Sequence, residues 1–354
     1  MITIGTDFSG IGSPEQALIK LGIEHKSMFA CDVDKYAKQS YLANYKTENF
    51  YDDITTRNHN EAPYVDLYVA GFPCQAFSMA GKRKGFEDTR GTLFFDLLQY
   101  LKAKKPKYFI LENVKGLLSH NKGRTFLTIL DCLAKAVNGQ YSFTNYEDGL
   151  NYYVYYKVLN TKDYGIPQNR ERVFIVGFRD EKHSFKFPKK MPLELRLKDI
   201  ISDNADDKYY LSDEQYKKMK TRNRYGDHII KKHQHIHPCL CAIGKADVGV
   251  INENNYIAHS LYPRSSKTGK GGTGHLSKED GTTYCLDTGN NQAIEYDKRI
   301  RRLTPKECFR LQGFPDSFVD KCREIGISDT QLYKQAGNSI TVDVMAYLIK
   351  EIIK

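Results

Sequence analysis

The chain has 354 residues, a formal net charge of +10 at pH 7 and a pI near 9.0. Its length suits two domains, and 40% hydrophobic with 27% charged residues excludes wholesale disorder. No apolar run is long enough to span a bilayer, and the N-terminus has no signal-peptide pattern. We therefore expect a soluble, cytoplasmic protein with reduced cysteines. The basic balance is compatible with a polyanionic partner, but basic proteins without such partners are equally common.

The first half of the chain alternates β-rich runs with amphipathic stretches. We predict strands over 2–6, 28–31, 65–70, 108–111, 153–158 and 173–178, and helices over 34–45, 93–102 and 125–137. Another helix begins near Ser13, where a Ser-x-x-Gln capping box is expected, and stops at Gly22. This alternation implies an α/β fold with a doubly wound, mostly parallel sheet and helices on both faces.

The pattern changes after about residue 180. Residues 181–300 are rich in Lys, Asp, Asn, Gly and His and have no sustained helical period, and a final amphipathic helix is predicted over 341–353. We expect a larger domain formed by 1–185 plus 325–354, and a second, smaller β-rich domain over 186–324.

A glycine-containing loop lies between the first strand and the first helix. Gly10 and Gly12 would let the backbone approach a ligand closely, although a tight turn without a ligand explains them equally well. Asp32 ends the second strand, where a carboxylate can accept hydrogen bonds from a ribose. Asp53, before Ile54, could contact an adenine amino group in a similar way. These residues fit a nucleotide-like cofactor.

Cys74 is the candidate nucleophile. It follows the strand predicted over 65–70, at the sheet edge where doubly wound folds place their sites. Pro73 stiffens the backbone before it, and residues 75–92 have the glycine-rich, basic composition of a mobile loop that could close over phosphates. The alternative is a structural thiol, which is the commoner role of a single cysteine.

Three further residues could share this crevice. Glu112 ends a predicted strand, where a desolvated carboxyl group could stay protonated and hydrogen-bond a ring nitrogen, or could simply be a solvated strand end. Arg170 and Arg172 precede another apolar strand. They could bind a phosphate or a carbonyl oxygen, or pair with acidic neighbours.

Taken in order, these segments resemble the motifs of the cytosine-5 DNA methyltransferase family, of the bacterial or phage restriction–modification type. The resemblance runs through most of the chain. It departs at Asp32, where the family usually has Glu, so the ribose contact should be altered. The matching segments are 7–12, 53–54, 71–78, 90–94, 112–114, 168–172, 302–315 and 335–339.

The resemblance implies S-adenosyl-L-methionine as the cofactor and S-adenosyl-L-homocysteine as its product. It also implies that Cys74 adds to carbon 6 of a cytosine flipped out of duplex DNA, with Glu112, Arg170 and Arg172 as its catalytic partners. The residues carried over to the cofactor pocket are Phe8, Gly10, Ile11, Gly12, Asp32, Val33, Asp53, Ile54, Pro73, Leu93, Asn338 and Ser339.

The divergent stretch after Arg172 corresponds to the family's target-recognition region. Double-stranded DNA is the expected partner of a monomeric enzyme, alongside a separately acting restriction endonuclease where one exists. Two rival functions are an RNA cytosine-5 methyltransferase and a DNA-binding regulator without activity. We expect DNA contacts from Gln75, Ser78, Lys82, Arg83, Lys84, Arg264, Lys267 and Lys270.

His233, His235, His237, Cys239 and Cys241 alternate along the chain and would share one face of a strand. This resembles a metal site. Pro238 interrupts the strand, however, and the spacing does not match common zinc patterns, so we predict no bound metal.

Overall fold

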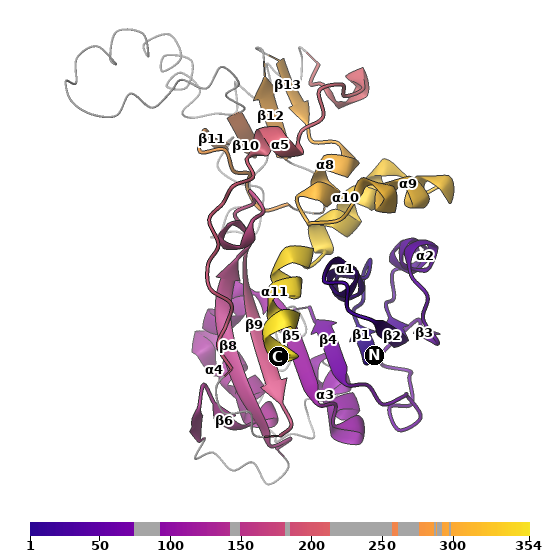
Figure 1. Ribbon diagram of the computed structural model, residues 1–354, viewed down its shortest axis with the longest axis vertical. Coiled ribbons are helices and arrows are strands. Elements are labelled where there is room, and N and C mark those ends of the chain that lie inside the picture. The colour runs from indigo at the N-terminus through magenta and orange to yellow at the C-terminus, as the bar shows by residue number, and fades with distance from the viewer. Residues whose placement is uncertain are drawn as a thin grey trace, which may run out of the picture.

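The structure is a computed structural model that describes residues 1–73, 93–141, 149–180, 185–212, 257–260, 276–286, 288, 292–296 and 299–354. A nine-stranded sheet forms the large unit, and a four-stranded sheet lies beyond one end of it (Figure 1). None of the helices in these ranges is long and apolar enough to cross a lipid bilayer.

The large sheet has the strand order β3-β2-β1-β4-β5-β9-β8-β6-β7. All neighbours from β3 to β5 are parallel, whereas β9 runs antiparallel to both β5 and β8. The winding changes direction between β1 and β4, which makes the carboxyl ends of these strands the topological switch point. The strands are β1 (Ile2–Asp7), β2 (His25–Cys31), β3 (Phe50–Tyr51), β4 (Leu67–Gly71), β5 (Tyr108–Val114), β6 (Ala134–Val137), β7 (Gln140–Tyr141), β8 (Tyr152–Asn160) and β9 (Glu171–Phe178).

Helices cover both faces of this sheet, as the sequence predicts. Alternation along β4 explains why: Leu67 and Val69 point to one hydrophobic cluster, and Tyr68 and Ala70 to the other. The first cluster includes residues of α1 (Ser13–Lys20), α2 (Lys35–Asn44), α10 (Asp329–Asn338) and α11 (Val342–Ile352). The second includes residues of α3 (Leu93–Lys104) and α4 (Arg124–Leu133).

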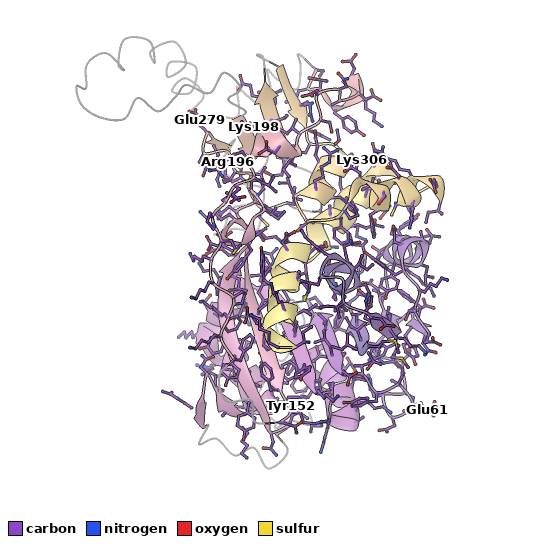
Figure 2. All side chains as sticks on the ribbon, in the orientation of Figure 1. Glu61, Tyr152, Arg196, Lys198, Glu279 and Lys306 are labelled. Atoms are coloured by element: carbon purple, nitrogen blue, oxygen red, sulfur yellow. The ribbon has the colours of Figure 1, made fainter. Side chains whose placement is uncertain are left out.

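The small sheet is antiparallel, in the order β11-β10-β12-β13. Arg196 and Lys198 lie at this end of the molecule, far from Tyr152 (Figure 2). The elements here are α5 (Leu197–Ile200), η5 (Asp207–Tyr209), β10 (Ile257–Ser260), β11 (Leu276–Lys278), β12 (Gln292–Tyr296) and β13 (Arg299–Arg302).

Two helices after the small sheet, α8 (Pro305–Arg310) and α9 (Asp316–Glu324), return to the large unit. Their buried side chains, such as Phe309 and Phe318, belong to the same hydrophobic cluster as Ile4 of β1. The division into 1–185 plus 325–354 and 186–324 stays a prediction. Phe318 of α9 packs against Tyr45 of the large unit, with the ring centroids 6.0 Å apart, which favours a boundary before α9 for the return to the large unit.

Two local predictions are wrong. The helix expected over 125–137 ends at Leu133, because residues 134–137 join the sheet as β6. The capping box at Ser13 does not form: Gly12 is the N-cap, with φ 80°, and the Ser13 hydroxyl lies 2.7 Å from that of Ser339. The side chain of Gln16 accepts a hydrogen bond from Tyr45 instead. The two side chains that the local pattern predicts as caps therefore form hydrogen bonds with residues distant in the chain instead.

Candidate active site

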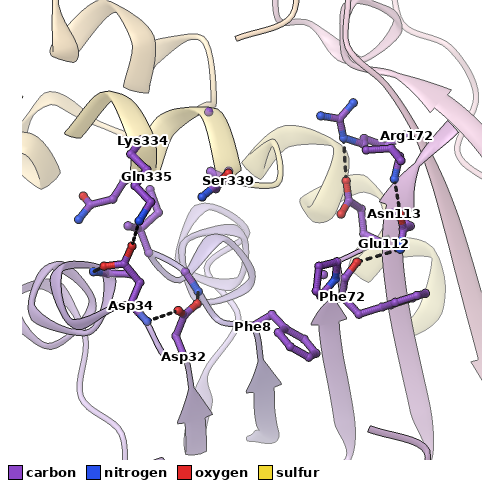
Figure 3. A pocket seen from close by; sticks show the side chains of 18 of the residues that line it. Phe8, Asp32, Asp34, Phe72, Glu112, Asn113, Arg172, Lys334, Gln335 and Ser339 are labelled. Atoms are coloured by element: carbon purple, nitrogen blue, oxygen red, sulfur yellow. Dashed lines mark hydrogen bonds and ion pairs between the residues drawn. The ribbon is translucent and has the colours of Figure 1, made fainter. Parts of the chain in front are cut away.

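A cavity of about 360 Å³ lies at the switch point, within the size range of cofactor and ligand sites. Figure 3 shows acidic and basic side chains on two sides of it, with Phe8 between them. Its lining comes from Phe8, Gly10, Ile11, Asp32, Asp34, Ala37, Gly71, Phe72, Pro73, Glu112, Asn113, Val114, Arg170, Arg172, Lys334, Gln335, Gly337, Asn338 and Ser339.

The loop after β1 brings its backbone to the cavity. Phe8 and Gly10 have left-handed backbones with φ of 53° and 52°, and a Cβ added at Gly10 would meet nothing within 4 Å. Asp32 holds this loop: one carboxylate oxygen accepts from the Gly10 amide at 2.8 Å and the other from the Asp34 amide at 2.9 Å. Burial raises the pKa of Asp32, although these two amide donors act in the opposite direction.

An ion pair joins α10 to α2 beside this loop. Lys334 Nζ lies 2.6 Å from an Asp34 carboxylate oxygen, and the other oxygen accepts from the Tyr36 and Ala37 amides at the start of α2 (Figure 3). Burial alone would raise the pKa of Asp34, but the Lys334 and amide hydrogen bonds lower it overall. A negative charge therefore stays at the helix N-terminus, where it is stabilising.

The residues present fit a nucleotide-like cofactor. Gly10 leaves open space where any other residue would place a side chain. Gln335 also lines the cavity and accepts from the Ser40 hydroxyl at 3.0 Å, while its Nε2 is buried without a partner among the described residues. That buried donor is available to a ligand.

The other side of the cavity carries Glu112, which is 8% exposed and therefore not a solvated strand end. Arg172 Nε lies 3.1 Å from a Glu112 carboxylate oxygen. Burial raises the pKa of Glu112, and the charges of Arg172 and Arg170 oppose this rise. Asn113 donates to the Phe72 carbonyl at 2.8 Å, so β5 also fixes the segment that leads to residue 74.

Arg170 is buried, and apart from Cys285 Sγ, which both arginines contact, its partners differ from those of Arg172. Its guanidinium donates to the carbonyls of Leu286, Gly337 and Ser339 at 3.2, 3.1 and 2.8 Å, and one nitrogen lies 3.2 Å from Cys285 Sγ. Arg170 thus joins the segment 337–339, which lines one side of the cavity, to the segment 285–286 that precedes β12. Its position indicates a positioning role.

The structure brings most of the predicted described residues together. Phe8, Gly10, Ile11, Asp32, Pro73, Asn338 and Ser339 line the cavity with the predicted catalytic residues Glu112, Arg170 and Arg172. Cys74 and the predicted DNA contacts Gln75, Ser78, Lys82, Arg83, Lys84, Arg264, Lys267 and Lys270 lie outside the described residues, as does the segment from His233 to Cys241.

Five predicted cofactor residues do not line the cavity that the described residues form. Gly12 packs against the Tyr45 ring instead, because a Cβ at this position would lie 2.4 Å from that ring. Ile54 and Leu93 contribute to the second hydrophobic cluster, and Val33 is 75% exposed. The Asp53 carboxylate accepts from the backbone and side chain of Thr55, both at 2.8 Å.

Sequence reasoning missed several lining residues. Gln335 and Gly337 lie within the last motif but were not assigned to the pocket. Asp34 had a local signal, because an aspartate before a helix is a common cap. Lys334 had none, because its partner lies 300 residues away in the chain.

A doubly wound sheet with a cavity at its switch point defines the class of α/β proteins that bind nucleotide-like cofactors. The C-5 cytosine-specific DNA methylase family model matches residues 5–354, and the chain belongs to this family. It is therefore a DNA cytosine-5 methyltransferase, and the family implies an S-adenosylmethionine-type cofactor.

The chain is 38% identical to the Type II methyltransferase M.SsoII of Shigella sonnei, over 98% of this chain and 78% of that protein. It is 40% identical to the Type II methyltransferase M.HaeII of Haemophilus aegyptius, over 96% and 88% of the respective chains. The fold is similar to that of S. pombe Dnmt2 methyltransferase, with a TM-score of 0.64 at 18% identity, over 99% of this chain and 97% of that one.

Proposed function

We propose that the chain methylates carbon 5 of a cytosine flipped out of duplex DNA, through a transient covalent bond between Cys74 and carbon 6. The observation that carries this proposal is the pairing of Glu112 with Arg172 in the same cavity as the Gly10 loop. The carboxyl group proposed to bind the base thus shares one cavity with Phe8, Gly10 and Ile11 of the proposed cofactor loop. The proposed cofactor, S-adenosyl-L-methionine, supplies a methyl group bound to a sulfonium.

Cys74 activates the base. Carbon 5 of cytosine is a weak nucleophile, and addition of the Cys74 thiolate to carbon 6 gives it enamine character. After methylation, loss of the proton on carbon 5 and elimination of the thiolate restore the aromatic ring. Pro73 lies at the cavity and directly precedes Cys74 in the chain, which supports this assignment.

Glu112 and Arg172 hold the base during this addition. Burial raises the pKa of Glu112, so its carboxyl group can take up a proton and donate to the ring nitrogen as electron density moves onto that nitrogen. Arg172 would hold the carbonyl oxygen at carbon 2 while keeping Glu112 in place. The Arg170 guanidinium donates to backbone carbonyls, so its contribution is to hold together the segments that surround the cavity.

Binding of duplex DNA requires extrusion of the target base, because carbon 6 is inaccessible within a stacked helix. We assign sequence reading to the small unit within 186–324 and phosphate contacts to the basic residues predicted from the sequence. A cognate endonuclease acting separately, and a monomeric enzyme, complete the proposal.

A covalent complex tests this mechanism. Bisulfite sequencing of DNA from expressing cells gives the recognition site, and a duplex with 5-fluorocytosine at that site blocks loss of the carbon 5 substituent. We expect a denaturation-resistant complex with the unsubstituted protein and with Lys26→Met, an exposed control, but none with Cys74→Ser. A stable complex formed by Cys74→Ser would contradict the assignment of the nucleophile.

A further inference from the structure

A buried polar cluster lies behind the cofactor loop, at the end of β1. The Asp7 carboxylate accepts from Arg57 Nη1 and Nη2, each at 2.7 Å, and from the Tyr68 hydroxyl at 2.6 Å. The side chains of Arg57 and Asp7 are 1% and 0% exposed. A bidentate pair with a third donor fixes the carboxylate in both position and orientation.

Arg57 is itself held on several sides. Its guanidinium carbon lies 4.8 Å from the ring centroid of Phe29, 5.2 Å from that of Tyr51 and 5.3 Å from that of Tyr100. Contacts of this kind favour a planar guanidinium over the compact ammonium of lysine. The charge of Asp7 raises the pKa of Arg57 in spite of its burial, so Arg57 stays charged.

The cluster joins the cofactor loop to two neighbouring segments of the chain. Asp7 directly precedes Phe8, whose left-handed backbone begins the cofactor loop. Arg57 follows the turn that contains Asp53, and Tyr68 lies on β4, three residues before Gly71 at its end. Arg57 does not line the cavity, so any effect on a ligand must pass through these segments.

We propose that Arg57 is a positioning residue for the cofactor: through Asp7 and Tyr68 it fixes the cofactor loop relative to the Asp53 turn and to β4. This inference rests on the proposed cofactor site. An ordinary structural pair would contribute to folding alone. A positioning pair must in addition set the affinity for the cofactor, because a displaced Phe8–Gly10 backbone no longer matches its ligand.

Binding of S-adenosylhomocysteine by titration calorimetry tests the proposal without turnover. Arg57→Lys keeps the positive charge but loses the pair of donors to the Asp7 carboxylate, and we expect its affinity for S-adenosylhomocysteine to be about tenfold weaker. Tyr68→Phe loses one donor, and we expect an affinity about fivefold weaker. Duplex DNA affinity, measured without cofactor, should change by less than about twofold. Lys26→Met, which removes the exposed pair with Glu48, is the matched control and should bind like the unsubstituted protein.

A double variant separates positioning from stability. Asp7→Asn with Arg57→Met leaves no unpaired buried charge, so it should melt above Arg57→Met alone while its affinity for S-adenosylhomocysteine stays about tenfold reduced. Unchanged affinity in the variants that fold, whatever their melting temperatures, would overturn the proposal. If Arg57→Lys does not fold, Tyr68→Phe and the double variant decide. Failure of the unsubstituted protein to bind this ligand would instead contradict the proposed cofactor, and the inference with it.

Discussion

At the scale of single residues, two arginines close together in the chain share a contact with Cys285 Sγ but otherwise have different partners. Arg170 is 3% exposed and donates to three backbone carbonyls, whereas Arg172 pairs with the carboxylate of Glu112. The first arrangement holds the walls of the cavity together, and the second places a charge where the base is expected. Their side chains should therefore contribute differently to folding and to turnover.

Substitution by methionine separates these two roles. Arg170→Met should lower the free energy of unfolding by about 2–4 kcal/mol, because three buried carbonyls lose their donor. Arg172→Met should lower kcat by roughly 100-fold with a smaller loss of stability. Denaturant unfolding and single-turnover methylation measure both effects. The account of these arginines is wrong if Arg170→Met is the more stable variant.

Glu15 gives the molecule a pH dependence that does not come from catalysis. It is buried at the start of α1 and accepts from the Tyr41 hydroxyl at 2.7 Å, while its second carboxylate oxygen has no partner among the described residues. Burial raises the pKa of Glu15 above its ordinary value of 4.5, against the hydrogen bond from Tyr41. Ionisation of Glu15 therefore opposes folding.

Because the folded-state pKa is raised, the folded protein binds the proton more tightly than the unfolded chain. The stability contributed by protonated Glu15 is present below about pH 4.5 and is lost as pH rises through the folded pKa. The free energy of unfolding of Glu15→Gln, relative to the unsubstituted protein, should thus increase between pH 5 and pH 8. Exposed Glu24→Gln is the control. A difference that stays constant with pH would refute a raised pKa at Glu15.

At the scale of elements, the cofactor loop contains two glycines that are required for different reasons. Gly10 has φ 52° and faces open space, whereas Gly12 has φ 80° and packs against the rings of Tyr45 and Tyr41. A side chain at Gly10 would enter the cavity, and one at Gly12 would enter the core.

Alanine substitutions should separate these reasons. Gly10→Ala should cost about 1 kcal/mol of stability from backbone strain but weaken binding of S-adenosylhomocysteine at least about tenfold. Gly12→Ala should cost about 3 kcal/mol, because the Tyr45 ring has to move. Thermal melting and calorimetry on both variants measure this. Equal losses of stability in the two would contradict the assignment of Gly12 to packing.

The elements also show what the sequence could predict. Strand periodicity located β1, β2, β4 and β5, and with them the shared carboxyl edge that gathers Gly10, Asp32 and Glu112. It did not predict the hydrogen bond between the hydroxyls of Ser13 and Ser339, which are 326 residues apart, or the ion pair between Lys334 and Asp34. Such pairs depend on chain topology, which no local pattern encodes. The nucleophile and the DNA contacts lie outside the described residues and stay predictions.

At the scale of the whole molecule, the two units are joined at the edge of the proposed catalytic cavity. Buried Gln168 donates to the Leu311 carbonyl at 2.7 Å and accepts from the Leu286 amide at 3.2 Å. Asn169 and Thr283 add a backbone bond of 3.0 Å. The small sheet is thereby held beside Arg170 and Arg172, which supports binding of DNA across the cavity mouth between the two units.

The central claim is that this protein methylates carbon 5 of cytosine in duplex DNA by means of Cys74. The most direct measurement is nucleoside mass spectrometry of duplex DNA after incubation with isotopically labelled S-adenosylmethionine. The account predicts labelled 5-methylcytosine with the unsubstituted protein and none with Cys74→Ser, whose melting temperature should be unchanged. Label on the exocyclic nitrogen, or 5-methylcytosine formed by Cys74→Ser at the parental rate, would contradict it.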